Sequence, residues 1–518
     1  MFSRFSKPLV AVLLLLALCC SLISCDDEPS KEAFQTAYEE SIDDFVDSIG
    51  TYYSLLGNYD TQDMSISLEA NLELSDACLG MLKNLNGTDF SWINDAKIKL
   101  SENFNGDLMS VALGLAYGGT DVVDADMIFD LANGYSYIRS AILNSTYLKQ
   151  KTQEQSLAEA SGMLGSVKLS EILPDKDALG SLLKKCYAKI MDGVQNVSFT
   201  EKELSANGVT EKCIAYEIAL SEKELLDISI SVSEMLKTDS DFKKIIVDSF
   251  DAFADSGLSE EQLGLGDASG EDFYDAIMAE LTEEISDMKE YTEASDKKLL
   301  TWTSYVTADL DVIGTKIDIT TEDGTAVFYS ANARNKNDVG KEIYLSADGE
   351  KLFEIKGDLT NDGKKLSGIY DFKLEGKSMA IIELENVDAK KLKEGHFVGS
   401  LTLSPSKKLI GILIGEGNED LSIQGISVST LSLKLDVKEN DGKKFNTAIS
   451  IMSSGSSYAT INLKGEMLES KDISIPSNTT ENIDSWASAL DFDALINKAS
   501  ESGVPSEVIE LFESLFGF

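Results

Sequence analysis

Side chains that could carry acid–base or metal chemistry are unequally supplied in this chain of 518 residues. It contains 89 aspartates and glutamates but only one histidine, His396. A single imidazole excludes any site that needs two, and a lone histidine is more often structural than catalytic. Asp309 and Asp311 have the spacing of residues that share one face of a strand, as an acid/base pair or a cation site would. Such pairs are expected by chance at this acid content, so the sequence predicts no catalytic residue, no metal site and no cofactor.

The net charge of the chain limits the kinds of partner that it can bind. With 45 basic residues the formal net charge is −44. An acid excess of this size repels phosphate backbones and anionic lipid surfaces, so we expect no nucleic-acid partner. The hydrophobic content of 43% is ordinary for a chain that buries a core, and the length suggests about three domains or lobes.

The N-terminal 24 residues have the order of a secretory signal. Arg4 and Lys7 precede an apolar run over 9–18 that is too short to span a membrane comfortably. The segment ends in Leu-Ile-Ser-Cys over residues 22–25, which resembles the lipobox of bacterial lipoproteins. That resemblance implies cleavage between Ser24 and Cys25 and a diacylglycerol on the thiol of Cys25. The alternative is an ordinary signal followed by an incidental cysteine.

Cleavage at this point would remove two basic residues and no acid, which changes the net charge from −44 to −46. Each methylene of an acyl chain that enters a bilayer contributes about 0.8 kcal/mol, so two chains suffice for stable attachment. We therefore expect an extracytoplasmic protein anchored to a cell membrane through Cys25. Whether this is the plasma membrane or an outer membrane stays open.

Three other cysteines would remain, Cys78, Cys186 and Cys213, and an odd number cannot all pair within one chain. A disulfide between Cys186 and Cys213 and a set of buried free thiols are both open.

Hydrophobic periodicity predicts the secondary structure of the remaining chain. Apolar residues at three-and-four spacing predict a helix over 29–57, and strict alternation over 64–74 predicts a half-buried strand. Six segments result: the signal at 1–24, a tether and helix at 25–63, a first antiparallel β region at 64–145, a mainly helical region with a short strand pair at 146–295, a β meander at 296–470, and C-terminal helices at 471–518.

Four Asp-Gly turns punctuate the meander, and turns of this kind join adjacent antiparallel strands. About ten strands in one twisted sheet tend to curl. The predicted fold class is α+β: a large, curved, half-barrel-like antiparallel sheet with N-terminal, central and C-terminal helices. A two-lobed version stays open, because strands followed by helices occur twice.

Helices, a curved meander and short terminal helices behind a lipobox resemble, in architecture alone, the carrier lipoproteins of the LolA and LppX group. In that group an open half-barrel holds acyl chains under a helical lid. The chain is also similar to large uncharacterised lipoproteins of anaerobic bacteria, for which the resemblance implies no activity.

Three functional hypotheses follow. The leading one is a non-catalytic envelope lipoprotein that binds an apolar or amphiphilic, lipid-like ligand or a protein partner in the concavity of its sheet. The second is a structural or interaction lipoprotein without a ligand cavity, in which the helices of 271–289 and 481–516 cover that face. A glycan-active enzyme that uses a carboxylate pair is the third and weakest.

Overall fold

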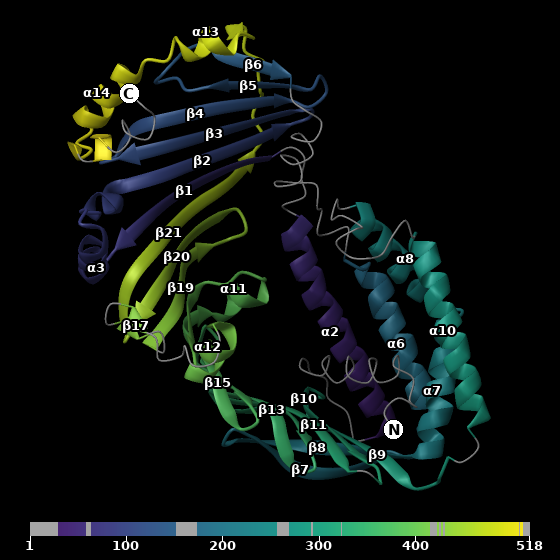
Figure 1. The fold of residues 1–518 in the computed structure, drawn as a ribbon. Coiled ribbons are helices and arrows are strands. Elements are labelled where there is room, and N and C mark those ends of the chain that lie inside the picture. Colours follow the sequence, from purple (N-terminus) through teal and green to yellow (C-terminus); the bar gives the residue numbers. More distant parts are fainter. Residues whose placement is uncertain are drawn as a thin grey trace. The chain divides into compact units, whose positions relative to one another are not determined.

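The computed structural model has two compact units, each built from two separate stretches of the chain. Unit 1 comprises residues 1–59 and 167–395, and unit 2 comprises residues 60–166 and 396–518. The structure describes residues 30–57, 64–151, 173–255, 269–291, 294–322, 324–414, 422–423, 426–427, 430–506 and 508–510. The fold class is α+β, as predicted, and Figure 1 shows broad sheets with helices beside them.

Unit 1 contains an antiparallel sheet in which each strand pairs with the next along the chain. Its strands are β7 (Ser198–Ala206), β8 (Val209–Ser221), β9 (Lys298–Val306), β10 (Val312–Thr320), β11 (Thr325–Asn335), β12 (Asp338–Ala347), β13 (Glu350–Asn361), β14 (Lys365–Leu374) and β15 (Lys377–Asp388). The predicted hairpin chemistry is present: Asp348 and Gly349, between β12 and β13, both have positive φ, at 49° and 83°. Such turns match the twist of the strands they join.

The sheet of unit 1 curls over at its β7–β8 end. The Tyr329 hydroxyl of β11 donates a hydrogen bond to the Ser205 carbonyl of β7 at 3.1 Å, and the Asn207 side chain donates to the Gly357 carbonyl of β13. A small apolar core that includes Leu204, Cys213 and further residues of β10 and β11 lies within this curl. Curvature, predicted from the strand count, is therefore present in this unit.

Several helices pack together on the opposite face of the unit 1 sheet at the β8–β10 end, and two of them contact its strands (Figure 1). They are α2 (Lys31–Gly57), α6 (Lys176–Gly193), α7 (Glu222–Leu236), α8 (Ser240–Asp255) and α10 (Gly270–Glu290), with a short α11 (Ala389–Lys393) after β15. α2 carries the apolar stripe that the sequence predicts, and its Phe34 and Tyr38 pack edge-on against Trp302 of β9. These contacts form the centre of the larger core.

Unit 2 contains a second sheet whose strand order does not follow the chain. In spatial order its strands are β16 (Gly399–Pro405), β19 (Leu431–Asn440), β20 (Lys444–Ser453), β21 (Ser456–Glu469), β1 (Met64–Leu74), β2 (Ala96–Asn105), β3 (Leu108–Tyr117), β4 (Thr120–Asp130), β5 (Tyr135–Arg139), β6 (Tyr147–Lys151) and β22 (Thr479–Thr480). All pairs are antiparallel except β6 with β22. The pairing of β1 with β21 joins the first β region to the end of the predicted meander.

Short elements surround this second sheet. They are α3 (Asp76–Asn86), η2 (Ser91–Asp95), α12 (Lys407–Ile414), a hairpin of β17 (Ser422–Ile423) and β18 (Ile426–Ser427), α13 (Ile483–Ala487) and α14 (Phe492–Glu501). α14 packs beside β4, and the Trp486 indole of α13 donates a hydrogen bond to the Thr146 carbonyl at 2.8 Å. The C-terminal helices therefore lie along the β4–β6 part of the sheet (Figure 1).

The cysteine alternatives are resolved by burial. Cys186 lies in the helical core and Cys213 in the small core under the β7–β8 curl, and both are free thiols. Burial raises the pKa of the Cys186 thiol to about 12 and that of Cys213 to about 11. Thiols held protonated in this way behave as small apolar side chains rather than nucleophiles.

Candidate functional site

One face of the unit 1 sheet is covered at one end and open at the other. Residues directly opposite each other on paired strands share a face, so a row can be followed across the sheet. Its members are Trp302, Ile317, Phe328, Leu345, Phe353 and Leu374. The exposed fraction is 3% at Trp302 and 7% at Ile317, under the helices, but 43%, 37% and 41% at the last three. The apolar pattern thus continues across strands that the helices leave exposed.

A second row lies beside it on the same face, two residues away on each of β12, β13 and β14. It contains Ile343, Ile355, Phe372 and Ala380 from β12 to β15. The first three side chains are partly exposed. With the row above, they give β12–β15 an apolar face two side chains deep, which we call the unit 1 apolar face.

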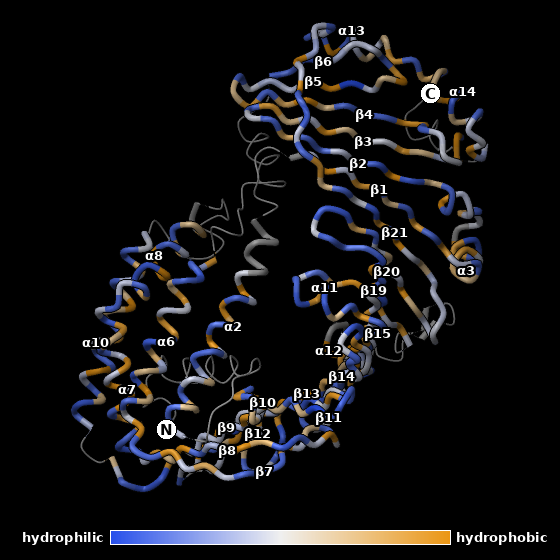
Figure 2. Tube along the Cα trace, turned by 180° about the vertical axis from the view of Figure 1, so that it is seen from behind, coloured by the Kyte–Doolittle hydropathy of each residue, from blue (hydrophilic) through white to orange (hydrophobic). Residues whose placement is uncertain are grey.

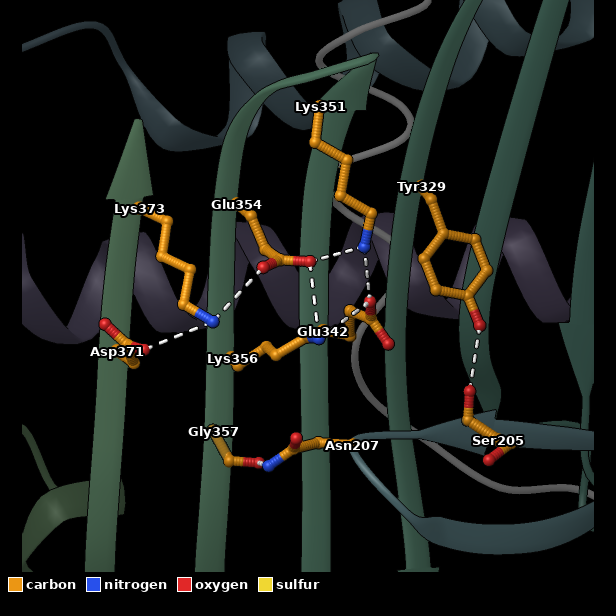
Figure 3. A network of polar contacts seen from close by, with 10 residues as sticks. All are labelled: Ser205, Asn207, Tyr329, Glu342, Lys351, Glu354, Lys356, Gly357, Asp371 and Lys373. Carbon is orange, nitrogen blue, oxygen red and sulfur yellow. Dashed lines mark hydrogen bonds and ion pairs between the residues drawn. The ribbon is translucent and has the colours of Figure 1, made fainter. Parts of the chain in front are cut away.

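The reverse face of the same strands carries a network of paired charges (Figure 3), with a few exposed apolar residues such as Ile369. Lys351 and Lys356 contact both Glu342 and Glu354, and Lys373 contacts Glu354 and Asp371. The cations hold the pKa of Glu354 below its ordinary value although burial alone would raise it. The lysines of this network thus have carboxylate partners. We therefore interpret the network as stabilising the sheet rather than as a ligand-binding site.

Unit 2 shows the same division into an apolar and a polar face. Figure 2 shows hydrophobic and hydrophilic residues interspersed along its strands, and the strand register sorts them onto opposite sides. One row reads Leu401, Leu435, Ile449, Ile461 and Leu72, and a second, on neighbouring strands, reads Leu68, Leu100, Leu113 and Ala125. We call this side the unit 2 apolar face.

Large side chains on the unit 2 apolar face remain in contact with solvent. Five of them are between 41% and 56% exposed: Ile98, Leu113, Leu433, Ile451 and Ile461. They span β19 to β3, whereas Met109 and Val111 on β3 are buried. Single exposed leucines need no explanation, but a run that crosses several strands on one face is typical of a binding surface.

Such a surface suits apolar groups, either the alkyl chains of a lipid or the apolar side chains of a protein. Aliphatic side chains in register offer dispersion contacts and a site where an apolar ligand leaves water, at about 25 cal/mol per Å². They supply no nucleophile or general base. The chemistry that both faces support is therefore non-covalent binding.

Of the residues singled out from the sequence, the signal and both lipobox positions, Ser24 and Cys25, lie outside the described residues. His396 lies just before β16, next to Gly442 in the β19–β20 turn, where a Cβ on the glycine would approach the imidazole to 2.9 Å. Arg139 forms an ion pair with Asp126 across β4 and β5 and lies over the Tyr147 ring. This arginine is held within its own sheet.

The strand interpretation of Asp309 and Asp311 is wrong. Both residues lie in the turn between β9 and β10. There the Thr307 amide donates to the Asp311 carbonyl, the Asp311 amide donates to the Thr307 hydroxyl, and Leu310 has a φ of 60°. The i, i+2 rule for a shared face applies only to extended chain, so it does not apply here.

Three further observations concern other classes of site. Within the described part of the chain, no group of three or more histidine, cysteine, aspartate or glutamate side chains is placed to hold a metal ion. None of its helices combines the length and apolar character that crossing a membrane requires. A depression of about 700 Å³ beside β8 is lined mostly by polar residues, among them Gln195, Glu217 and Lys298, which does not suit an apolar ligand.

The sequence interpretation missed a polar group at the border of the unit 1 apolar face. Asn332 and Arg334 of β11 and Lys341 of β12 share that face, since Asn332 is opposite Lys341 and Arg334 is opposite Val339. The available signal was the alternation Val339, Lys341, Ile343 on one strand, in which a lysine occupies an apolar position.

Comparison with known proteins identified no relative of this chain. No family model, no curated protein and no solved structure matches the chain. The geometry described above is therefore the basis for the functional argument.

Proposed function

We propose that this protein is a non-catalytic cell-envelope lipoprotein that binds a lipid-like ligand on its apolar sheet faces. Anchorage would be through acylated Cys25 on the extracytoplasmic side of a membrane. The observation that carries the proposal is the exposure of large aliphatic side chains across neighbouring strands in both units.

Folding alone does not account for these side chains. A sheet that served only as scaffold would bury its apolar face or carry polar residues on it, because exposed aliphatic patches favour aggregation. The helices cover the β8–β10 part of unit 1, and α10, which was expected over a sheet face, packs on α7 and α8. The C-terminal helices lie along β4–β6 of unit 2. Exposed apolar residues persist beyond both, which favours a ligand over the purely structural alternative.

Uptake of a fluorescent fatty acid tests the proposal. We expect the full-length protein to bind cis-parinaric acid, with a rise in its fluorescence. The paired substitution Ile98→Asp with Phe353→Asp places a carboxylate on each apolar face and should weaken binding about tenfold, or about 1.4 kcal/mol, because each charge must be desolvated against an alkyl chain.

The control is Ser101→Asp with Ile369→Asp. Ser101 and Ile369 are also exposed, lie on the reverse faces of the same two sheets, and give the same change in charge. Binding by the control should match the unsubstituted protein. Absence of uptake, or equal uptake by both paired variants, would contradict the proposal.

A further inference from the structure

We infer that the unit 1 apolar face takes a single-chain anionic amphiphile, such as a fatty acid, whose head group binds beside Lys341. This rests on the proposed function and names the class of ligand and the orientation in which it binds. The inference is carried by the unpaired Lys341 at one border of an otherwise apolar face, with Arg334 beside it on the neighbouring strand.

Lys341 is a half-buried cation without an anionic partner. Among the described residues no carboxylate forms an ion pair with its amine, in contrast to the paired lysines on the reverse face. Burial lowers the pKa of the Lys341 amine, and the positive charge of Arg334 lowers it further. A cation in this setting gains from any anion that reaches it, because removal from water is otherwise uncompensated.

Its neighbours in the same register row place an aromatic ring beside the lysine. Lys341 is opposite Gly357 of β13, which in turn is opposite Tyr370 of β14. A Cβ at Gly357 would approach the Tyr370 ring to 2.9 Å and the Lys341 side chain to 3.1 Å. The glycine therefore lets the tyrosine ring lie over β13 toward the lysine.

Asn332 and Arg334 extend the polar border onto β11. The Asn332 Oδ1 atom is buried and accepts no hydrogen bond from the described residues. An acceptor oxygen does not bind a carboxylate, so the attraction for an anion comes from the two cations, Arg334 and Lys341. The Arg334 backbone amide donates to a Glu211 carboxylate oxygen at 2.6 Å, and the positive charge of Arg334 partly offsets the rise in the Glu211 pKa that burial causes. Glu211 thus compensates Arg334 in part, whereas Lys341 is left as the uncompensated charge.

Apolar side chains lead away from this border along the strands. From Lys341 the same face of β12 continues through Ile343 to Leu345, which are two and four residues further on. Four residues of strand span about 13 Å, enough for some ten methylenes of an extended alkyl chain. The row of Leu345, Phe353 and Leu374 would then contact the middle of the chain.

Displacement of cis-parinaric acid from the Ile98→Asp protein, in which the unit 2 apolar face is blocked, separates the head group from the tail. We expect palmitate to compete about tenfold more strongly than hexadecanol, which has the same tail and no charge. Lys341→Gln should remove this preference by weakening palmitate about tenfold while hexadecanol stays unchanged, and Lys341→Arg should retain it. Lys390→Gln is the matched control, since Lys390 is 84% exposed on α11.

Arg334→Gln is a second variant that does not depend on how the Lys341 substitution folds, and we expect a smaller loss of palmitate binding from it. If palmitate and hexadecanol compete equally and neither glutamine variant changes this, the head-group inference is wrong while the proposed function stands. If neither ligand binds the unsubstituted protein, both fail.

Discussion

Replacement of Cys25 by alanine is expected to abolish incorporation of an alkyne-labelled fatty acid into this protein. If the proposed lipobox assignment holds, the thiol of Cys25 accepts the diacylglycerol, and alanine offers no nucleophile in its place. Loss of the acyl anchor also removes its contribution to membrane binding, which is about 0.8 kcal/mol for each methylene in the bilayer. A chain that carries a net charge near −46 has no electrostatic attraction to anionic headgroups to replace it.

In-gel detection of the label after growth with the fatty acid measures this directly. Cys78→Ala is the matched control, because Cys78 is a free cysteine on α3 of unit 2. The control should carry as much label as the unsubstituted protein. Label that persists in the Cys25→Ala protein would show that the lipobox assignment is wrong.

Trp302→Ala is expected to lower the free energy of unfolding of unit 1 by about 3–5 kcal/mol, the usual cost of deleting a buried tryptophan. Its ring contacts Phe34 and Tyr38 edge-on, with centroid separations of 5.8 and 5.1 Å. Its indole N–H donates to the Tyr38 hydroxyl at 3.1 Å, and that hydroxyl is also hydrogen-bonded to Ser304. Removal of the ring leaves a cavity and takes one hydrogen bond from a buried hydroxyl.

Urea unfolding of the purified protein, followed by circular dichroism, measures the loss. Phe353→Ala provides the contrast, since Phe353 lies on the same row of the same sheet but is 37% exposed. Its substitution should cost about 1 kcal/mol or less. Equal losses for the two variants would mean that the helical layer does not cover Trp302 as described.

Local chemistry made much of this fold predictable. The alternation over 64–74 predicted β1 with its bounds, and the Asp-Gly turns predicted hairpins such as β12–β13. Each of these signals is written in a few adjacent residues.

The pairing of β1 with β21 was not predictable in the same way. No turn joins these strands, and their register depends on matching Leu68 with Gly465 and Leu72 with Ile461 across a large part of the chain. Hydrophobic period assigns a residue to a face but does not say which strand will lie beside it. The interleaving of the two units follows from this pairing.

The candidate site residues, too, were predictable only where local sequence determines them. The alternation of apolar and polar residues predicted that each sheet would have an apolar face. Which parts of that face stay exposed depends on where α2 and α14 pack. Lys341 interrupts the apolar pattern of β12 by one residue, and a single lysine in a strand is ordinarily a solvated side chain. Lys341 is recognisable as a candidate ligand-binding residue only in the structure. There β11, β13 and β14 place Asn332, Gly357 and Tyr370 beside it.

Native mass spectrometry of the full-length acylated protein after gentle extraction tests ligand binding most directly. We expect a species heavier than the acylated polypeptide by the mass of a lipid, and this lipid should dissociate when the collision energy is raised. A spectrum that contains the acylated polypeptide alone would contradict it.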